Sequence, residues 1–306
     1  MASEAAKMEI RLGIAPIAWT NSDLPQLGGE TSLETCLSES RQAGFSGTET
    51  GVKFPMDPKI LGPILAKHEL ALVSGWFSGE ILKRSLTEEK ERIAGQMATF
   101  RSLGALVLVY AETTGTVQST IDTPVSRRPR LADTDFSAYG RRLTELAEWM
   151  AGEGVPMAFH HHMGTVVENQ REVDLLMAHT GEAVGLLLDT GHLVYAGADI
   201  QEVTRQHGSR IVHVHCKDIR PEVLRRARQR DLSFLAAILE GIFTVPGDGF
   251  IDYYAFARLL AEQNYEGWVV VEAEQDPAKA PPGAYSAMGR RHLAEAFGAA
   301  GFVISE

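Results

Sequence analysis

The sequence predicts a closed (β/α)8 barrel, in which parallel strands form the wall and helices surround it. Along the 306 residues, eight short apolar runs alternate with eight segments of helical periodicity. This alternation is typical of parallel strands joined by crossover helices, and eight repeats favour a closed barrel over an open sheet. Polar and ionisable residues follow several of the apolar runs, as expected at the rim where barrel enzymes build their sites. We expect one domain over residues 1–306, since barrels of roughly 250 residues form a single domain.

The first half of the chain supplies four strands and three helices. The strands are expected at 11–20, 47–51, 70–77 and 105–112. The helices between them are expected at 33–43, 57–68 and 87–103. Gly44 and Gly104 stand where a left-handed residue often ends a helix, and Asp57 precedes a proline that can begin one. A polar loop at 113–134 follows, long enough to form a lid or a subunit contact.

The second half continues the same alternation. Its strands are expected at 155–162, 184–192, 211–218 and 267–274. Its helices are expected at 136–152, 169–179, 199–207, 253–264 and 285–297. An insertion at 219–249 separates strands seven and eight, and it contains an arginine-rich helix followed by the turn sequence VPGDG.

The composition argues against several classes of protein. The net charge of −11 opposes extended contacts with nucleic-acid phosphates, which need a basic face. The chain has no apolar run of the ~18 residues that a membrane span requires, so we expect no membrane partner. Only two cysteines occur, Cys36 and Cys216, which fits a cytoplasmic location and no disulfide framework. No Gly-Lys pair is present, so a phosphate loop for nucleotide hydrolysis is not supported.

Three consecutive histidines, His160, His161 and His162, close the fifth strand. Because strand side chains alternate between two faces, His160 and His162 share one face. Three later strands also end in potential ligands, and all these ends meet at one rim of a barrel. We therefore expect a divalent-metal site, for which mixed nitrogen and oxygen ligands favour manganese, cobalt, zinc or iron over calcium. Its expected inner ligands are His160, Asp189, His215 and Glu272.

Each ligand also has a simpler interpretation. Asp189 could cap the loop before Thr190, and Glu272 could pair with Lys217. The histidines could be capping groups bonded to backbone, and His213, deeper on its strand, is expected to be a hydrogen-bonded core residue. Because four strands converge, a metal site formed by all four residues is better supported than a metal role for any one of them alone.

Other residues could line the mouth of the site. Candidates for proton transfer or for holding the substrate are Glu49, His162, His192 and Lys217. Candidates for substrate binding are Trp19 and Trp76, which could stack on a sugar or cyclitol ring, Arg220, which could hold a substrate oxygen, and Glu274. The tryptophans could equally be core residues, and Lys217 could instead form an ion pair.

Several motifs together resemble a known family. HVHCKD, VPGDG and VVVEAEQDP are similar to the xylose-isomerase-like barrels, a superfamily of sugar isomerases and epimerases. APIAWTNSDLPQLGG, FHHHMGT and FTVPGDG narrow the resemblance to the inosose dehydratases, over nearly the whole chain. In the wider superfamily the ligand on strand five is generally a glutamate, whereas this chain has His160. The metal could therefore be held by Asp189, His215 and Glu272, with His160 or water completing the shell.

The resemblance implies a reaction and a cofactor. It implies dehydration of 2-keto-myo-inositol, a polyhydroxylated cyclic ketone, to a trihydroxycyclohexane-1,2-dione through a metal-stabilised enediolate. Manganese or cobalt is the implied metal, with zinc, iron or magnesium as alternatives, and a homo-oligomer (dimer or tetramer) is expected. His162 or His192 is the preferred acid. Competing functions are isomerisation or epimerisation of a keto-sugar, endonucleolytic DNA repair, and sugar binding without turnover.

Overall fold

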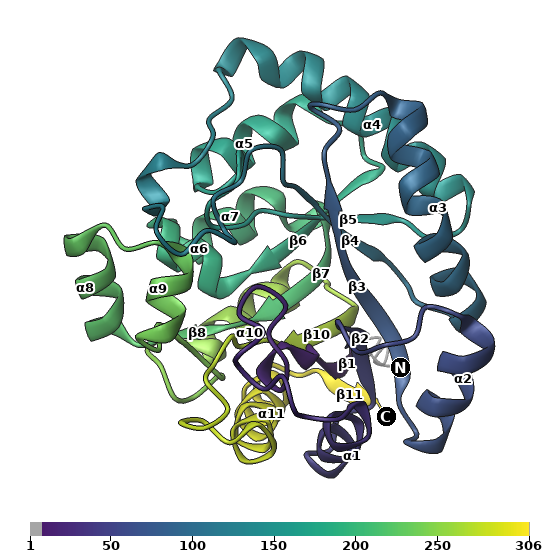
Figure 1. Cartoon of the computed structure of the whole chain (residues 1–306), viewed down its shortest axis with the longest axis vertical. Helices are drawn as coiled ribbons and strands as arrows, with labels where there is room; N and C mark the ends of the chain where they lie inside the picture. The colour runs from purple at the N-terminus through teal and green to yellow at the C-terminus, as the bar shows by residue number, and fades with distance from the viewer. Residues whose placement is uncertain (1–7, 306) are drawn as a thin grey trace, which may run out of the picture.

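The computed structural model describes residues 8–305, and its main sheet closes on itself. Each of the eight barrel strands pairs in parallel with the next barrel strand along the chain, and the eighth pairs with the first. The predicted (β/α)8 barrel is therefore confirmed. Figure 1 looks toward the strands inside their ring of helices. The barrel strands are β1 (Glu9–Ile14), β2 (Gly47–Thr50), β3 (Ala71–Gly79), β4 (Leu108–Glu112), β5 (Met157–His160), β6 (Val184–Asp189), β7 (Ile211–Cys216) and β10 (Gly267–Val271).

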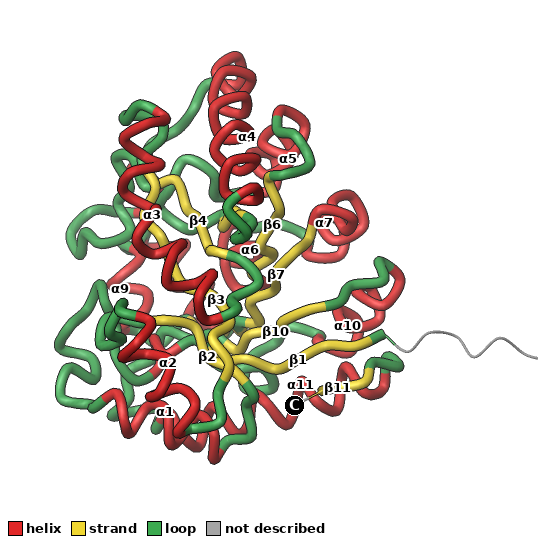
Figure 2. The backbone as a smooth tube through the Cα atoms, turned by 90° about the vertical axis from the view of Figure 1, so that its right-hand side faces the viewer, coloured by secondary structure: helices red, strands yellow, loops and turns green. Residues whose placement is uncertain are grey.

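Helices cover the outside of the barrel, as Figure 2 shows from the side. Their apolar faces pack on the outward side chains of the strands and form the main hydrophobic core. The third helix begins with a capping box between Ser85 and Glu88 and ends at Gly104, which has φ 77°. The outer helices are α1 (Leu33–Gln42), α2 (Pro58–Lys67), α3 (Leu86–Leu103), α4 (Phe136–Gly152), α5 (Gln170–His179), α7 (Ile200–His207), α10 (Tyr253–Glu262) and α11 (Pro282–Ala299).

Apolar side chains fill one part of the barrel interior. Val73, Trp268 and Val270 form a small cluster with Ala15. A Cβ atom on Gly47 would lie 2.6 Å from the Trp268 ring, so only glycine fits beside this indole. Because side chains of a strand alternate between two faces, every second residue after this cluster also points into the barrel. These residues lie nearer the carboxyl ends of the strands.

The insertion is more structured than the sequence indicated. After β7, the two-residue strands β8 (Asp218–Ile219) and β9 (Phe243–Thr244) form an antiparallel pair. Between them lie α8 (Pro221–Arg230) and α9 (Phe234–Leu239), which pack their apolar side chains into a second hydrophobic cluster. The predicted arginine-rich helix is confirmed as α8, whereas α9 and the two short strands were not predicted.

Other elements also differ from the expectation. The first strand ends at Ile14, because Pro16 begins a short 3-10 helix. An unpredicted helix follows β6 directly, and a last strand pairs with the beginning of β1. The remaining elements are η1 (Pro16–Ala18), η2 (Val125–Arg127), η3 (Asp133–Asp135), α6 (Thr190–Ala196), η4 (Gly208–Arg210) and β11 (Val303–Ser305). Within residues 8–305, no helix has the length and apolar character to cross a bilayer.

Candidate metal centre and pocket

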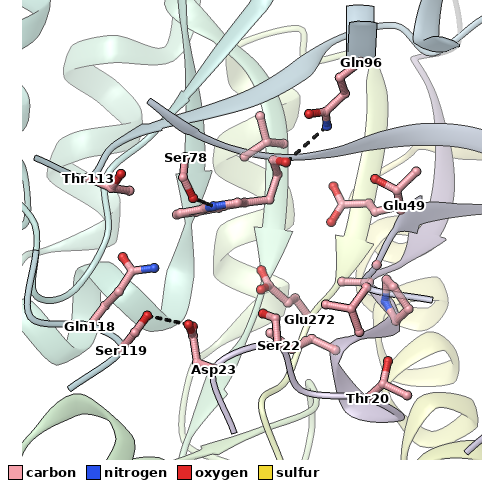
Figure 3. A pocket seen from close by; sticks show the side chains of 18 of the residues that line it. Thr20, Ser22, Asp23, Glu49, Ser78, Gln96, Thr113, Gln118, Ser119 and Glu272 are labelled. Atoms are coloured by element: carbon pink, nitrogen blue, oxygen red, sulfur yellow. Dashed lines mark hydrogen bonds between the residues drawn. The ribbon is translucent and has the colours of Figure 1, made fainter. Parts of the chain in front are cut away.

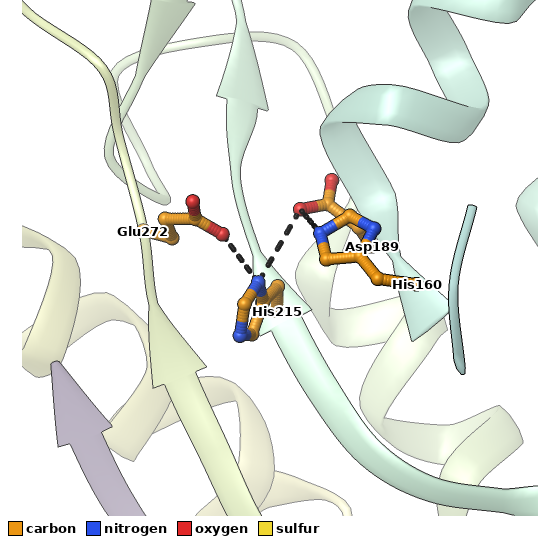
Figure 4. A group of neighbouring side chains, drawn as sticks. All are labelled: His160, Asp189, His215 and Glu272. Carbon is orange, nitrogen blue, oxygen red and sulfur yellow. Dashed lines mark ion pairs between the residues drawn. The ribbon is translucent and has the colours of Figure 1, made fainter. Parts of the chain in front are cut away.

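The structure brings the four expected metal ligands to one point at the rim of the barrel. His160, Asp189, His215 and Glu272 come from four different strand ends, and one donor atom from each lies within 4.8 Å of the others. Figure 4 shows Asp189 and Glu272 on either side of the His215 ring, with His160 beside Asp189. Their side chains are at most 12% exposed.

The unsatisfied atoms of this cluster fit a metal ion. Asp189 Oδ2, His215 Nδ1 and Glu272 Oε2 are buried and make no hydrogen bond within the described residues, although His215 Nδ1 and Glu272 Oε2 contact each other as an ion pair. Asp189 Oδ2 lies 3.7 Å from His215 Nδ1 and 3.7 Å from His160 Nε2. Burying several polar atoms without hydrogen bonds is costly, whereas a divalent cation would use all of them at once. Two imidazoles and two carboxylates suit a divalent transition metal.

Hydrogen bonds orient both histidines so that a lone pair faces the cluster. His160 Nδ1 contacts the carbonyl oxygen of His161, which can only accept, so Nε2 carries the lone pair. His215 Nε2 donates to Glu49 Oε1 at 3.0 Å, so Nδ1 is the nitrogen left for a metal. A carboxylate behind a ligating histidine is a common way to fix the ring and increase its basicity.

Glu49 is therefore a positioning group in this structure. Its Oε1 atom also accepts from His213 Nε2 at 3.0 Å and from the Ser74 hydroxyl. Although burial opposes it, the neighbouring His215 and His213 lower the pKa of Glu49 well below its usual range. A carboxylate held in this ionised form is a poor proton acceptor, which argues against the proton-transfer role that the sequence suggested.

Asp189 combines two functions at the end of β6. Its Oδ1 atom accepts the backbone N–H of His192 at 2.8 Å and so caps α6. Its Oδ2 atom points into the metal-ligand cluster. The sequence offered capping and metal binding as alternatives; the cap is observed, and it leaves Oδ2 available as a metal ligand.

A second group of ionisable side chains adjoins the first. Donor atoms of His162, His192 and Glu274 lie within 4.8 Å of one another, and all three residues are buried. Lys217, which is fully buried, extends its ammonium to 2.7 Å from Glu274 Oε2 and 3.1 Å from His192 Nε2. The rings of His162 and His192 have centroids 3.9 Å apart, and Phe234 from the insertion packs against both.

The charges in this second group depend on each other. Burial raises the pKa of Glu274 to about 7, although the Lys217 ammonium opposes the shift. Burial alone would lower the pKa of Lys217, but Glu272 and Glu274 raise it above its ordinary value. Lys217 is therefore a fixed positive charge near neutral pH, and Glu274 can exchange a proton there.

A cavity of about 730 Å³ opens beside the metal-ligand cluster and reaches it at His215, Glu272 and Glu49. Figure 3 shows its polar side chains, with the Ser119 hydroxyl bonded to Asp23 between two loops. The Trp76 indole, which also lines the cavity, donates to the Ser78 hydroxyl. Small polar side chains are its main polar lining, namely Thr20, Ser22, Asp23, Thr50, Ser78, Gln96, Thr113, Thr116, Gln118 and Ser119. The cavity can therefore form many hydrogen bonds to a polar ligand next to the metal-ligand cluster.

Three of the four expected substrate-binding residues lie outside the cavity lining. Trp19 is 1% exposed in the main core, where its Nε1 donates to Glu39 at 2.7 Å, although its neighbours Ile17 and Thr20 line the cavity. Arg220 donates to the Gly241 and Phe243 carbonyls and forms an ion pair with Asp248, so it holds the insertion together. Glu274, which is paired with Lys217, does not line the cavity either, whereas Trp76 does.

Sequence reasoning missed some residues of the site. Gln118 lies in the loop expected at 113–134, and no local pattern distinguishes it from other polar loop residues. Arg128, in the same loop, is 5% exposed and binds Glu168 at 3.0 Å and Glu172 at 2.7 Å. This buried ion-pair network joins the loop to the segment after β5. Glu168 and Glu172, which follow FHHHMGT, were the sequence signal that could have indicated a basic partner.

The fold and the ligand cluster together define a barrel with a group of potential metal ligands at its rim. A family model described as "Xylose isomerase-like TIM barrel" matches residues 37–296. The chain belongs to this family.

Two relatives match almost the full chain. The chain is 52% identical to "Rhizopine catabolism protein MocC" of Rhizobium meliloti over 298 residues, which cover 97% of this chain and 92% of the relative. It is 41% identical to "Inosose dehydratase" of Geobacillus thermodenitrificans (strain NG80-2) over 292 residues, which cover 95% of this chain and 98% of the relative.

Solved structures show the same fold at low identity. A protein titled IOLI, with a binding zinc atom, matches with a TM-score of 0.67 at 18% identity, covering 94% of this chain and 98% of its own. An L-ribulose 3-epimerase matches with a TM-score of 0.67 at 16% identity, covering 95% of each chain. At these identities the likeness supports the fold alone.

Proposed function

We propose that this chain is a metal-dependent hydro-lyase that converts 2-keto-myo-inositol to a trihydroxycyclohexane-1,2-dione and water. The observation that carries the proposal is the cavity that reaches the metal-ligand cluster at His215 and Glu272. Its hydroxyl, amide and carboxylate side chains can bond to the hydroxyl groups of a cyclic ketone, and its apolar side chains, among them Ile17, Val52 and Trp76, can pack on the ring. The 41% identity to an inosose dehydratase over 95% of the chain supports the same reaction class.

The four ligands would hold a divalent cation, with manganese or cobalt as our proposed metal. Such an ion would supply Lewis-acid polarisation of the ketone and its neighbouring hydroxyl. The chain must then remove a proton from the carbon beside the ketone, and donate one to the β-hydroxyl as its carbon–oxygen bond breaks. These two transfers together release one water molecule.

We assign proton transfer to His162, which adjoins the cavity through Trp76, although burial lowers the pKa of His162 to about 4. Its Nδ1 contacts the Met163 carbonyl at 2.8 Å, so Nε2 carries the lone pair and can accept a proton. Its ring lies 5.3 Å, centroid to centroid, from Trp76, which lines the cavity. His192 is 0% exposed between Phe234 and Phe243, so we assign it to the support of His162 and Lys217.

Turnover of 2-keto-myo-inositol by metal-stripped protein, with metals added back one at a time, tests this proposal. Dione formation, followed by ultraviolet absorbance, should require manganese, cobalt or another divalent ion. A change that conserves the mass of a keto-sugar would move the assignment to an isomerase or epimerase. Because one relative is named for rhizopine catabolism, the panel should include a rhizopine beside the unsubstituted ketone.

Assembly and location are part of the same proposal. We propose a homo-oligomer, dimer or tetramer, since Val52, Met56 and Ile60 expose 60%, 41% and 52% of their surface in one short stretch. Light scattering on the purified protein would test it. We also propose a cytoplasmic location, which the two free, buried cysteines support and which fractionation of cells would test.

A further inference from the structure

Lys217 lies between two groups of metal-ligating side chains. On one side its Nζ atom is 3.4 Å from Glu272 Oε1 and 3.8 Å from Asp189 Oδ2, which belong to the four-residue metal-ligand cluster. On the other side it is 2.7 Å from Glu274 and 3.1 Å from His192, which belong to the adjoining group. One ammonium therefore contacts members of both groups.

The adjoining group has the chemistry of a metal site. It consists of two imidazoles and one carboxylate, from His162, His192 and Glu274, with donor atoms within 4.8 Å of one another. Such donors suit the same divalent transition metals as the four-residue cluster. However, the ammonium of Lys217 contacts two of these three side chains, so a cation there would meet a fixed positive charge at close range.

The position of Lys217 is built into the fold. The Thr190 hydroxyl bonds to both backbone groups of Lys217, accepting from its N–H at 3.0 Å and donating to its carbonyl at 2.9 Å. A Cβ atom on Gly191 would lie 2.6 Å from Lys217 Cγ, so the lysine stem uses space that only a glycine leaves. The Phe243 ring covers the ammonium, with its centroid 4.8 Å from Nζ.

The balance of charge favours one metal ion with the lysine. Asp189, Glu272 and Glu274 are three buried carboxylates around Lys217. When ionised, they are neutralised by one divalent cation and one ammonium together. A second divalent cation would add two positive charges that no further carboxylate in this contact group would match, and buried charge without a partner is costly.

We propose that the ammonium of Lys217 takes the place of a second divalent cation, so that His162, His192 and Glu274 form a latent metal site. The chain then binds one divalent ion, and removing the charge of Lys217 opens the second site. This inference concerns the number of metal ions, and it holds or fails whether or not the chain dehydrates a keto-inositol.

Metal stoichiometry tests the inference directly. Metal-stripped wild type, Lys217→Met, Lys217→Arg and the double variant Lys217→Met with Glu274→Gln are dialysed against manganese, and bound metal is counted by mass spectrometry. We expect one ion per chain for wild type and Lys217→Arg, two for Lys217→Met, and one again for the double variant. Electron paramagnetic resonance should show a spin-coupled pair of manganese ions in Lys217→Met alone.

Three outcomes would overturn the proposal. These are two ions in the wild type, one ion in a folded Lys217→Met, and a second ion that survives Glu274→Gln. Lys67→Met, which removes an exposed lysine, is the matched control and should bind one ion. If Lys217→Met does not fold, the wild-type count still decides, because a second ion beside an intact Lys217 contradicts the proposal.

Discussion

The two halves of the barrel mouth offer different chemistry. The ends of β1 to β4 and their loops supply small hydroxyl and amide side chains to the cavity, including Thr20, Ser78 and Gln118. The ends of β5, β6, β7 and β10 supply the buried imidazoles and carboxylates, with Lys217 among them. In the proposed reaction, the hydrogen-bonding groups for the substrate and the metal-ligating groups therefore lie on different sides of the ring, and they meet at His215 and Glu272.

The largest effect should come from the charged half. Asp189→Asn can keep the cap on α6 through Oδ1, but it replaces the oxygen that faces the cluster with an amide that cannot bind a metal. Because the metal supplies several kcal/mol of transition-state stabilisation, we expect turnover to fall by ~10³-fold or more. Metal content and turnover check this together. Asp199→Asn, which alters another helix cap, is the control and should retain both.

The next effect separates proton transfer from metal binding. His162→Gln removes a group that can accept and donate protons, so we expect kcat to fall by ~10²–10⁴-fold, the usual contribution of general acid–base catalysis. Bound manganese should stay unchanged, since His162 is not one of the four cluster ligands. A normal kcat in His162→Gln would remove this residue from the chemistry.

A smaller effect should appear where the halves are linked. Glu49→Gln weakens the acceptor that orients His215, and loss of such partners typically lowers metal affinity by ~10–100-fold. We expect full turnover to return at saturating metal, which a titration with manganese would show. Turnover that saturating metal does not restore would mean that Glu49 takes part in the reaction itself.

The polar half should respond in substrate binding. Gln118→Ala removes one neutral hydrogen-bonding group from the cavity, so we expect KM to rise by ~5–10-fold, as for the loss of about 1 kcal/mol, with little change in kcat. Steady-state kinetics over a range of substrate concentrations would separate the two constants. A fall in kcat without a change in KM would place Gln118 with the reactive groups instead.

The smallest effect on activity is expected outside both halves. Trp19→Phe removes the bond to Glu39 in the core, and we expect the free energy of unfolding to fall by about 1 kcal/mol or slightly more. Denaturant unfolding would measure this loss, and turnover should stay unchanged. Altered KM for the ring substrate would restore the stacking role that the sequence suggested for Trp19.

The barrel and the meeting of the four ligands could be predicted because they depend on repeating geometry. Parallel strands in a barrel end at one rim, so His160, Asp189, His215 and Glu272 were expected to converge. That they bind a metal remains a prediction. Trp19 was misplaced because Pro16 ended the strand early. The role of Glu49 could not be predicted, because local sequence does not show which histidine lies opposite it in the closed barrel.

The insertion could be predicted only in outline. The arginines marked a helix, but the pairing of β8 with β9 was needed to bring Arg220 back onto the Gly241 and Phe243 carbonyls. That pairing joins two-residue strands far apart in the chain, and such short segments carry little pattern of their own.

The bond from Glu49 to His215 has a consequence for protein engineering. Glu49 is on β2 and His215 on β7, and these strands are separated by β1 and β10 around the closed ring. The orientation of one metal-facing nitrogen is thus fixed by a distant part of the wall. If only the four ligands were transplanted into another barrel, the His215 ring would lose the partner that fixes its orientation. A transplanted site must therefore also include Glu49 on β2, at the same distance across the barrel.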